Sequence, residues 1–327
     1  MIRKQIVSSN EVDKQNQRIS LFALQEMADH LSQSESVTRM GVAHDATLLP
    51  VGKVIRGELV ALDHGTTGLQ VHIDDFMDEF QQITGPDNEW LYYGRSMNDN
   101  RPFVDIYSDL GGEFTVSLNP TDFAVSDFRE IEHFISENQH GQVETLVKKA
   151  LASEIEIVIT LATWLLQCLV FKKVLDKTAE KISDDIASGY DKVKQLAKFI
   201  FSRIKGKRTI TYLLSAPNQP VELIVRCDTA ETLAKALVEK ESGYIADTYE
   251  KFLQHLNGDI KKIQFLFNAE TNKWELNYIT SSTGEVIGTE KCYKRTVKLY
   301  KEILQSPAAG FSIGAAVTYT AEEIQDA

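Results

Sequence analysis

Two short stretches of the sequence hold residues that could carry out acid–base or nucleophilic chemistry. His44 and Asp45 stand side by side in GVAHDATLLPVG, and Ser117 lies in GEFTVSLNP. A serine nucleophile needs a base within hydrogen-bond reach and donors for the oxyanion. An imidazole can take that proton at neutral pH, whereas a neighbouring carboxylate orients or stabilises it. His44 and Ser117 are therefore the candidate catalytic residues, provided that the fold brings them together.

The His-Asp pair also fits a purely structural interpretation. An aspartate at a turn often accepts hydrogen bonds from its own backbone, and Asp45 stands just before the turn LLPVG. His44 and Asp45 would then shape a loop and take no part in a reaction. The sequence leaves both interpretations open.

The order of motifs around His44 resembles that of a peptidase family. The stretches RISLFALQEMADHL, GVAHDATLLPVGKVIRGELV and TTGLQV follow one another in the N-terminal third of the chain. They resemble the front half of phage prohead proteases and related capsid-maturation peptidases, where a helix precedes a His-Asp pair, a Pro-x-Gly turn and a strand. The resemblance implies that His44 is catalytic and that a serine on a later strand is the nucleophile. Ser117 departs from that family's usual Ser-small-Gly context, and GFSIGAA around Ser312 comes too late in the chain.

The sequence carries no other motif for a cofactor or a metal. Cys168, Cys227 and Cys292 are far apart and lack CxxC or Cys/His spacing, so neither a zinc site nor a disulfide framework is expected. No Gly-rich phosphate loop occurs in the sequence. The net charge of −12 disfavours a nucleic-acid partner, because phosphate binding needs a concentrated basic surface. We expect no cofactor and no bound metal.

An uncharged run of fifteen residues, IVITLATWLLQCLVF, dominates the middle of the chain between residues 157 and 171. As a helix it would rise about 22 Å, which is longer than many buried helices need and shorter than the roughly 30 Å of a bilayer core. The basic stretch 172–208 that follows has eleven Lys and Arg against five Asp and Glu, with helical spacing that predicts amphipathic helices broken near Gly189. This central region predicts either a buried helix or a segment for self-association or membrane contact, with the candidate residues Ile157, Leu161, Trp164, Leu165, Leu169, Phe171, Lys172 and Lys173.

The organisation of the elements predicts an α+β protein of more than one unit. A chain of 327 residues exceeds the size at which single hydrophobic cores stop growing. Short β-like runs separated by Gly, Pro and Asp indicate a β-rich N-terminal domain over 1–135, and a helical connector follows over 136–206. The C-terminal domain, 207–327, shows the order β-β-α-β-β-α, which favours an antiparallel sheet with helices on one face.

The function that these patterns favour is a non-enzymatic bacterial accessory protein of the kind encoded beside phage-related or defence genes. Its α/β units would bind a protein partner, and its central helices would assemble copies or contact a membrane. Two alternatives remain: a serine peptidase, active or decayed, that uses His44 and Ser117, and a membrane-acting effector that uses 157–171. The start of the chain lacks an apolar signal region, so a cytoplasmic location is expected, with membrane association as the alternative.

Overall fold

The computed structural model describes residues 1–12, 18–42, 45–104, 114–138, 141–147, 155–170, 179–204, 209–238, 242–305, 312–313 and 317–319. Helices and strands both contribute heavily, which confirms the α+β class. The chain divides into two compact units, each assembled from segments far apart in sequence. Unit 1 lies within Met1–Asp105 and Tyr278–Ala315, and unit 2 within Ile106–Asn277 and Ala316–Ala321. The segments 1–135, 136–206 and 207–327 follow chain order instead, and their independent folding stays a prediction.

Unit 1 contains a four-stranded antiparallel half-barrel. Its strands follow the order β1-β4-β3-β2, and the short β15 pairs with β2. Helix α1 packs on β3, where the bare backbone of Gly57 permits close approach, since a Cβ there would lie 3.0 Å from the Cα of Ala28. The elements are β1 (Ile2–Ser9), α1 (Leu21–Gln33), β2 (Thr38–Gly41), β3 (Gly52–Ala61), β4 (Thr67–Asp75) and β15 (Ser312–Ile313), with short 3-10 turns at Asp63–Gly65 and Met77–Glu79.

The rest of unit 1 consists of short strands and the helix α7. Strand β14 pairs with the end of β13 and with β6, and β6 pairs with β5, all antiparallel. One face of α7 enters the hydrophobic core through Cys292 and Tyr300, which are almost fully buried. The elements are β5 (Gln81–Thr84), β6 (Trp90–Gly94), β14 (Val286–Thr289) and α7 (Glu290–Gln305).

Unit 2 is built on a mixed sheet in the order β16-β8-β7-β9-β10-β11-β12-β13. The pairs β7·β8, β9·β10 and β11·β12 are parallel, whereas β7·β9 and β10·β11 are antiparallel. Strand β13 (Lys273–Thr280) crosses the boundary between the units. The other strands are β7 (Phe114–Leu118), β8 (Gln142–Val147), β9 (Ile155–Leu161), β10 (Ile210–Ser215), β11 (Val221–Cys227), β12 (Lys262–Asn268) and β16 (Val317–Tyr319).

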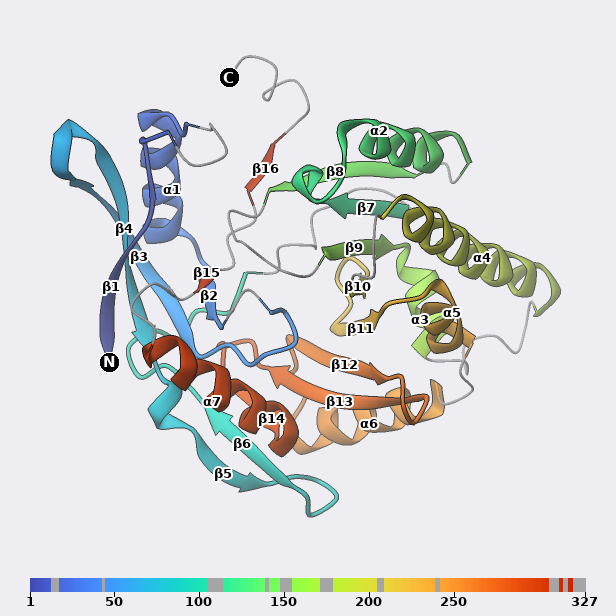
Figure 1. The fold of residues 1–327 in the computed structure, drawn as a ribbon. Helices are drawn as coiled ribbons and strands as arrows, with labels where there is room; N and C mark the ends of the chain where they lie inside the picture. The colour runs from blue at the N-terminus through green and yellow to red at the C-terminus, as the bar shows by residue number, and fades with distance from the viewer. Residues whose placement is uncertain are drawn as a thin grey trace. The chain divides into compact units, whose positions relative to one another are not determined.

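The helices of unit 2 lie on one side of these strands (Figure 1). Aromatic contacts tie them to the sheet: Phe201 of α4 meets Tyr212 of β10, and Tyr244 of α6 meets Phe265 of β12. The helices are α2 (Val125–His133), α3 (Thr163–Val170), α4 (Ala179–Arg203), α5 (Ala230–Val238) and α6 (Ser242–His255), with a 3-10 turn at Pro120–Asp122 and a π-helical turn at Phe134–Asn138.

The prediction of a single apolar helix over 157–171 is wrong. Residues 155–161 form the strand β9, and a separate helix α3 begins at Thr163. Strand β9 lies between β7 and β10 and is buried along nearly its whole length, so its side chains do not show the period of two that marks a half-exposed strand. The β-branched residues of IEIVITL were the available signal, because such side chains favour strands over helices.

The predicted order of elements in the C-terminal region is confirmed in outline. The prediction that its sheet is antiparallel is wrong. Strands β10 and β11 form the expected antiparallel pair, yet β11 pairs with β12 in parallel. A parallel pair needs a long crossover, and two helices, α5 and α6, supply it where one was expected. An additional strand, β14, precedes α7.

The predicted break near Gly189 in the basic amphipathic region is wrong, because one continuous helix passes through this position. Gly189 lies inside α4, which runs from Ala179 to Arg203, while residues 171–178 and 205–208 lie outside the described part of the chain. Among the described residues, no helix combines the length and the apolar character that crossing a bilayer requires.

Candidate functional site

Of the two candidate catalytic residues, the structure describes Ser117 but not His44. Ser117 lies on β7, only 3% exposed, and its hydroxyl has no hydrogen-bond partner. His44 lies outside the described residues, so the pairing of His44 with Ser117 stays a prediction.

Asp45 takes the structural role that the turn interpretation predicted. Its carboxylate Oδ1 accepts a hydrogen bond of 2.8 Å from the backbone N–H of Thr47 and one of 2.6 Å from the Thr47 hydroxyl. Arg295 on α7 in turn donates to the carbonyl of Thr47 at 2.5 Å. This turn is therefore held in place by its own side chains and by α7.

The residues of the apolar segment are partly described. Ile157 and Leu161 belong to β9 and are fully buried. Helix α3 contains Trp164, Leu165 and Leu169, of which the structure describes only the backbone. The described residues do not include Phe171, Lys172 and Lys173. The described part of the segment thus contributes to the sheet of unit 2 and to the helix that follows it.

The two faces of the unit 2 sheet differ sharply in chemistry. Successive side chains of a strand point to opposite faces, so residue parity along each strand sorts them. One face is apolar and carries Val116, Ile159, Tyr212, Leu223 and Phe265 under the helices. The opposite face carries a polar side chain on each of seven neighbouring strands, beside buried apolar ones such as Val158 and Leu213, and we call it the polar face.

A continuous polar row crosses this second face at right angles to the strands. Register pairs connect Gln142 with Thr115, Thr115 with Thr160, and Thr160 with Ser215. The row continues through Glu222 and Gln264, which are register partners, and Gln264 bonds Asn277. At about 4.8 Å between strands, the seven positions span roughly 29 Å. Five of the seven positions are buried, the exceptions being Gln142 and Ser215. Buried polar side chains depart from the apolar composition of most protein interiors.

Three hydroxyls of the row, and that of Ser117 beside them, are buried and have no hydrogen-bond partner among the described residues. Thr115 and Thr160 have no exposed surface, and their hydroxyls lack a partner, as do those of Ser117 and Ser215. Leaving a hydroxyl buried and unpaired costs about 1–3 kcal/mol. Four such groups on one face therefore store several kcal/mol of unfavourable free energy. Native proteins rarely tolerate this, and each instance calls for a specific cause.

The other half of the row is fully connected. The Glu222 carboxylate, 3% exposed, accepts a 2.7 Å ion pair from Lys262 and a hydrogen bond from Gln264, whose own amide oxygen accepts from Asn277 at 2.5 Å. This series of hydrogen bonds shows that the sheet can satisfy buried polar groups with its own side chains. The unpaired half is therefore a local feature of β7, β8, β9 and β10.

Glu144 on β8 extends the unpaired cluster. It is the register partner of Ser117, and its Oε2 is buried and has no hydrogen-bond partner. Burial raises the pKa of this carboxyl above its ordinary value. We call Thr115, Ser117, Glu144, Thr160 and Ser215 the hydroxyl cluster.

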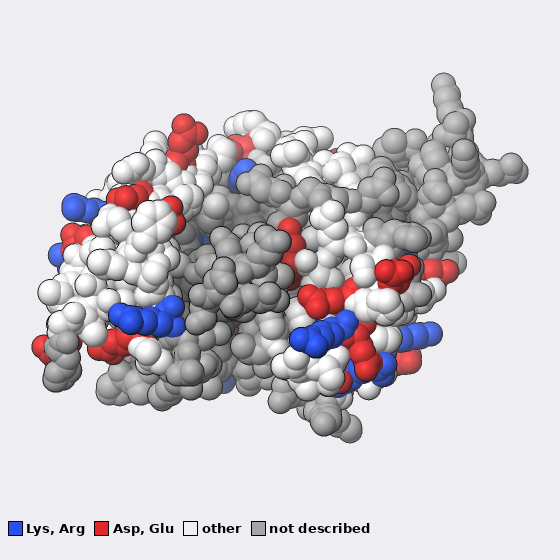
Figure 2. Space-filling view, turned by 90° about the horizontal axis from the view of Figure 1, so that it is seen from above, with Lys and Arg blue, Asp and Glu red and all other residues white. Residues whose placement is uncertain are grey.

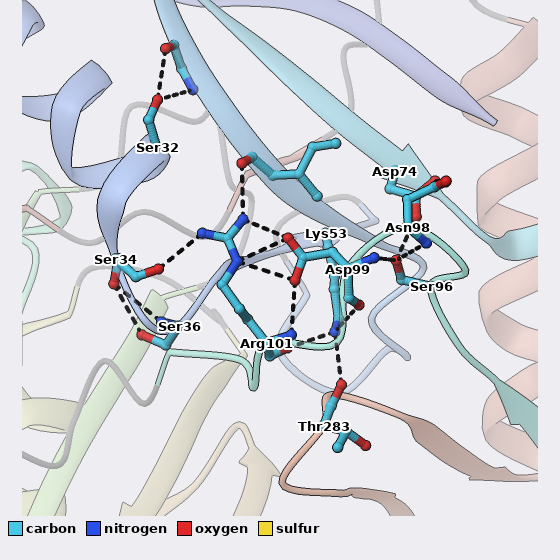
Figure 3. A network of polar contacts seen from close by, with 12 residues as sticks. Ser32, Ser34, Ser36, Lys53, Asp74, Ser96, Asn98, Asp99, Arg101 and Thr283 are labelled. Carbon is cyan, nitrogen blue, oxygen red and sulfur yellow. Dashed lines mark hydrogen bonds and ion pairs between the residues drawn. The ribbon is translucent and has the colours of Figure 1, made fainter.

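A second polar network, in unit 1, is complete and structural (Figure 3). The ammonium of Lys53, with no exposed surface, donates to the carbonyl oxygens of Asp99 at 2.8 Å, Arg101 at 2.6 Å and Thr283 at 2.9 Å. Arg101 pairs with the Asp99 carboxylate and donates to the carbonyls of Ser34 and Ile55. Because Lys53 has used all three of its donors, it clamps the backbone and offers nothing to a ligand.

The sequence reasoning reached Ser117 but missed its neighbours. Thr115 and Ser117 alternate with apolar residues in FTVSL, and that alternation is the ordinary sign of a two-faced strand. Thr160 was hidden inside the run that was assigned to a helix. Pairing between strands, which places Glu144 and Ser215 on the same face of the sheet as Ser117, has no local signal in the sequence.

The described residues suggest no metal or nucleic-acid site. They contain no group of three or more His, Cys, Asp or Glu side chains placed to hold a metal ion. On the side shown in Figure 2, acidic and basic side chains of the described residues are interspersed, with no broad basic surface among them. Comparison with protein-family models, with curated proteins and with solved structures gives no match.

Proposed function

We propose that this protein is a non-enzymatic binding protein whose unit 2 holds a polar ligand against the hydroxyl cluster. The observation that carries the proposal is the row of buried hydroxyls without partners on β7, β9 and β10. A ligand with matching donors and acceptors would satisfy these groups and offset the unfavourable free energy of the unpaired hydroxyls. Binding sites commonly keep such unfavourable features because they are relieved only when the ligand is present.

In this proposal Ser117 binds the ligand and is not a nucleophile. A catalytic serine requires a base that accepts its proton, and none of the described residues bonds the hydroxyl of Ser117. The genomic setting suggested by the sequence, beside phage-related or defence genes, and the membrane or self-association role of the central region both stay predictions.

The test is a ligand screen with matched variants. Mixtures of sugars, polyols, nucleosides and amino acids are added to the full chain, and binding is detected by saturation-transfer NMR. We expect at least one compound to bind the wild type and to lose binding in Thr160→Val, which replaces the hydroxyl by a methyl group of similar shape. Thr271→Val, which changes an exposed residue in the turn between β12 and β13, should bind as the wild type does.

Two outcomes would overturn the proposal. Either no compound in the screen binds, or the compounds that bind keep their affinity in both Thr160→Val and Thr115→Val. In the second case the ligand lies elsewhere, and bound water, which often satisfies buried polar groups, becomes the better explanation of the hydroxyl cluster.

A further inference from the structure

We infer that the ligand of the hydroxyl cluster carries a positively charged amine or guanidinium group that pairs with Glu144. This inference rests on the proposed function and adds the chemical class of the ligand. It follows from the charges on the polar face, from the position of Glu144 and from the donors that each ligand class could supply.

The first step is the balance of charge on the polar face. Glu222 is neutralised by Lys262 at 2.7 Å, and Glu156 and Arg226 have interactions of their own. Glu144 differs, because its buried Oε2 has no hydrogen-bond partner among the described residues, and burial raises the pKa of its carboxyl. Among the described carboxylates of this face, Glu144 is the one with a buried oxygen that has no hydrogen-bond partner.

The second step is the position of Glu144 beside acceptors. It faces Ser117 across the β8·β7 pair, and Gln142 and Thr115 form the next pair on the same face of the sheet. Direct register partners on neighbouring strands place their Cβ atoms about 5 Å apart. An ammonium has three donors and a guanidinium five, so either group could donate to the carboxylate and to adjacent hydroxyl oxygens at once.

The third step excludes the opposite charge. An anionic ligand would need a free cation, but the described basic residues on the strands of this face, Arg226, Lys262 and Lys273, already interact with other groups. An anion would also meet the Glu144 carboxylate. Burying a carboxylate is unfavourable unless an opposite charge or hydrogen-bond donors compensate it, and a cationic ligand supplies both.

The experiment compares charged compounds with neutral ones of the same shape. Isothermal titration of the full chain uses L-arginine against L-citrulline and L-lysine against L-norleucine, with agmatine and spermidine as further cations. We expect one or more cations to bind, and their neutral counterparts to bind at least tenfold more weakly. Glu144→Gln should remove at least tenfold of the affinity for the cation, because the variant lacks the charge with which the cation pairs.

The control and the contrary outcomes separate this inference from the proposed function. Glu137→Gln, which neutralises an exposed glutamate in the π-helical turn, should bind cations like the wild type. If none of the cations binds, or if Glu144→Gln binds them equally well, the inference is wrong. If neutral compounds alone bind and depend on Thr160, the proposed function survives without a cationic ligand, whereas binding of neither class defeats both.

Discussion

Thr115 and Thr160 face each other across the antiparallel pair of β7 and β9, and neither of their buried hydroxyls has a hydrogen-bond partner. Threonines in this arrangement can bond one another across strands, but these two do not. The pair therefore marks a place where the interior of unit 2 is polar and unsatisfied. Its meaning can be tested without knowing the ligand.

Thr160→Val should raise the free energy of unfolding of the ligand-free protein by about 1–2 kcal/mol, because an unpaired buried hydroxyl is replaced by a methyl group. Urea unfolding followed by circular dichroism measures the change. Thr296→Val is the matched control: its equally buried hydroxyl donates to the carbonyl of Cys292 at 2.9 Å and accepts from the N–H of Leu49 at 3.1 Å. That variant should lose about 1–2 kcal/mol.

A loss of stability in Thr160→Val comparable to that in Thr296→Val would show that the Thr160 hydroxyl is satisfied in solution. Bound water is the group that could do this. The unpaired cluster would then be part of an ordinary hydrated interior.

The sequence allowed some elements to be predicted and concealed others for physical reasons. The helix that the motif order places before the His-Asp pair is present as α1, which buries Leu24 and Ala28 on one face and leaves the other exposed. Strand β9 was mistaken for a helix, because a strand covered on both faces loses the alternation that identifies it. The hydroxyl cluster depends on which strands pair, and pairing between residues as distant as Thr160 and Ser215 is decided by the whole fold.

Lys53→Met should destabilise the protein by about 3–5 kcal/mol, because three backbone carbonyls lose their shared donor at once. The methionine keeps much of the side-chain volume, so the loss reports the ammonium group. Urea unfolding measures the effect, and Lys301→Met on the exposed side of α7 should change stability by less than about 0.5 kcal/mol. Equal, small effects in both variants would mean that the Lys53 clamp is not required for the fold.

The charge of Lys53 should also make stability depend on pH. Burial lowers the pKa of Lys53 from 10.5 to about 8 in the folded protein. Between these two values the unfolded chain binds more protons than the folded one, so the contribution of Lys53 to the free energy of unfolding rises with pH across that window. The slope is at most about 1.4 kcal/mol per pH unit.

The measurement compares unfolding of the wild type and of Lys53→Met at pH 7, 8, 9 and 10, since all other titrating groups are shared. The stability difference between the two proteins should widen above pH 8. A difference that stays constant to pH 10 would show that the three carbonyls keep the ammonium charged and outweigh its desolvation.

Glu222 and Lys262 provide the last prediction, because they connect the satisfied half of the polar row. Glu222→Leu removes a carboxylate that is 3% exposed and that accepts from both Lys262 and Gln264. The remaining donors lose their acceptor inside the protein, and breaking one side of a buried ion pair typically costs about 3–5 kcal/mol. Replacing both partners, in Glu222→Leu with Lys262→Met, should recover part of this loss, since no uncompensated charge remains.

Urea unfolding of the wild type, the two single variants and the double variant gives the coupling energy directly. We expect a coupling of about 1–3 kcal/mol, far above the value for an exposed pair such as Lys294 with Glu290 on α7. A coupling near zero would mean that Glu222 is held by Gln264 and its other contacts alone, and that the row is a hydrogen-bonded chain in which the ion pair plays no part.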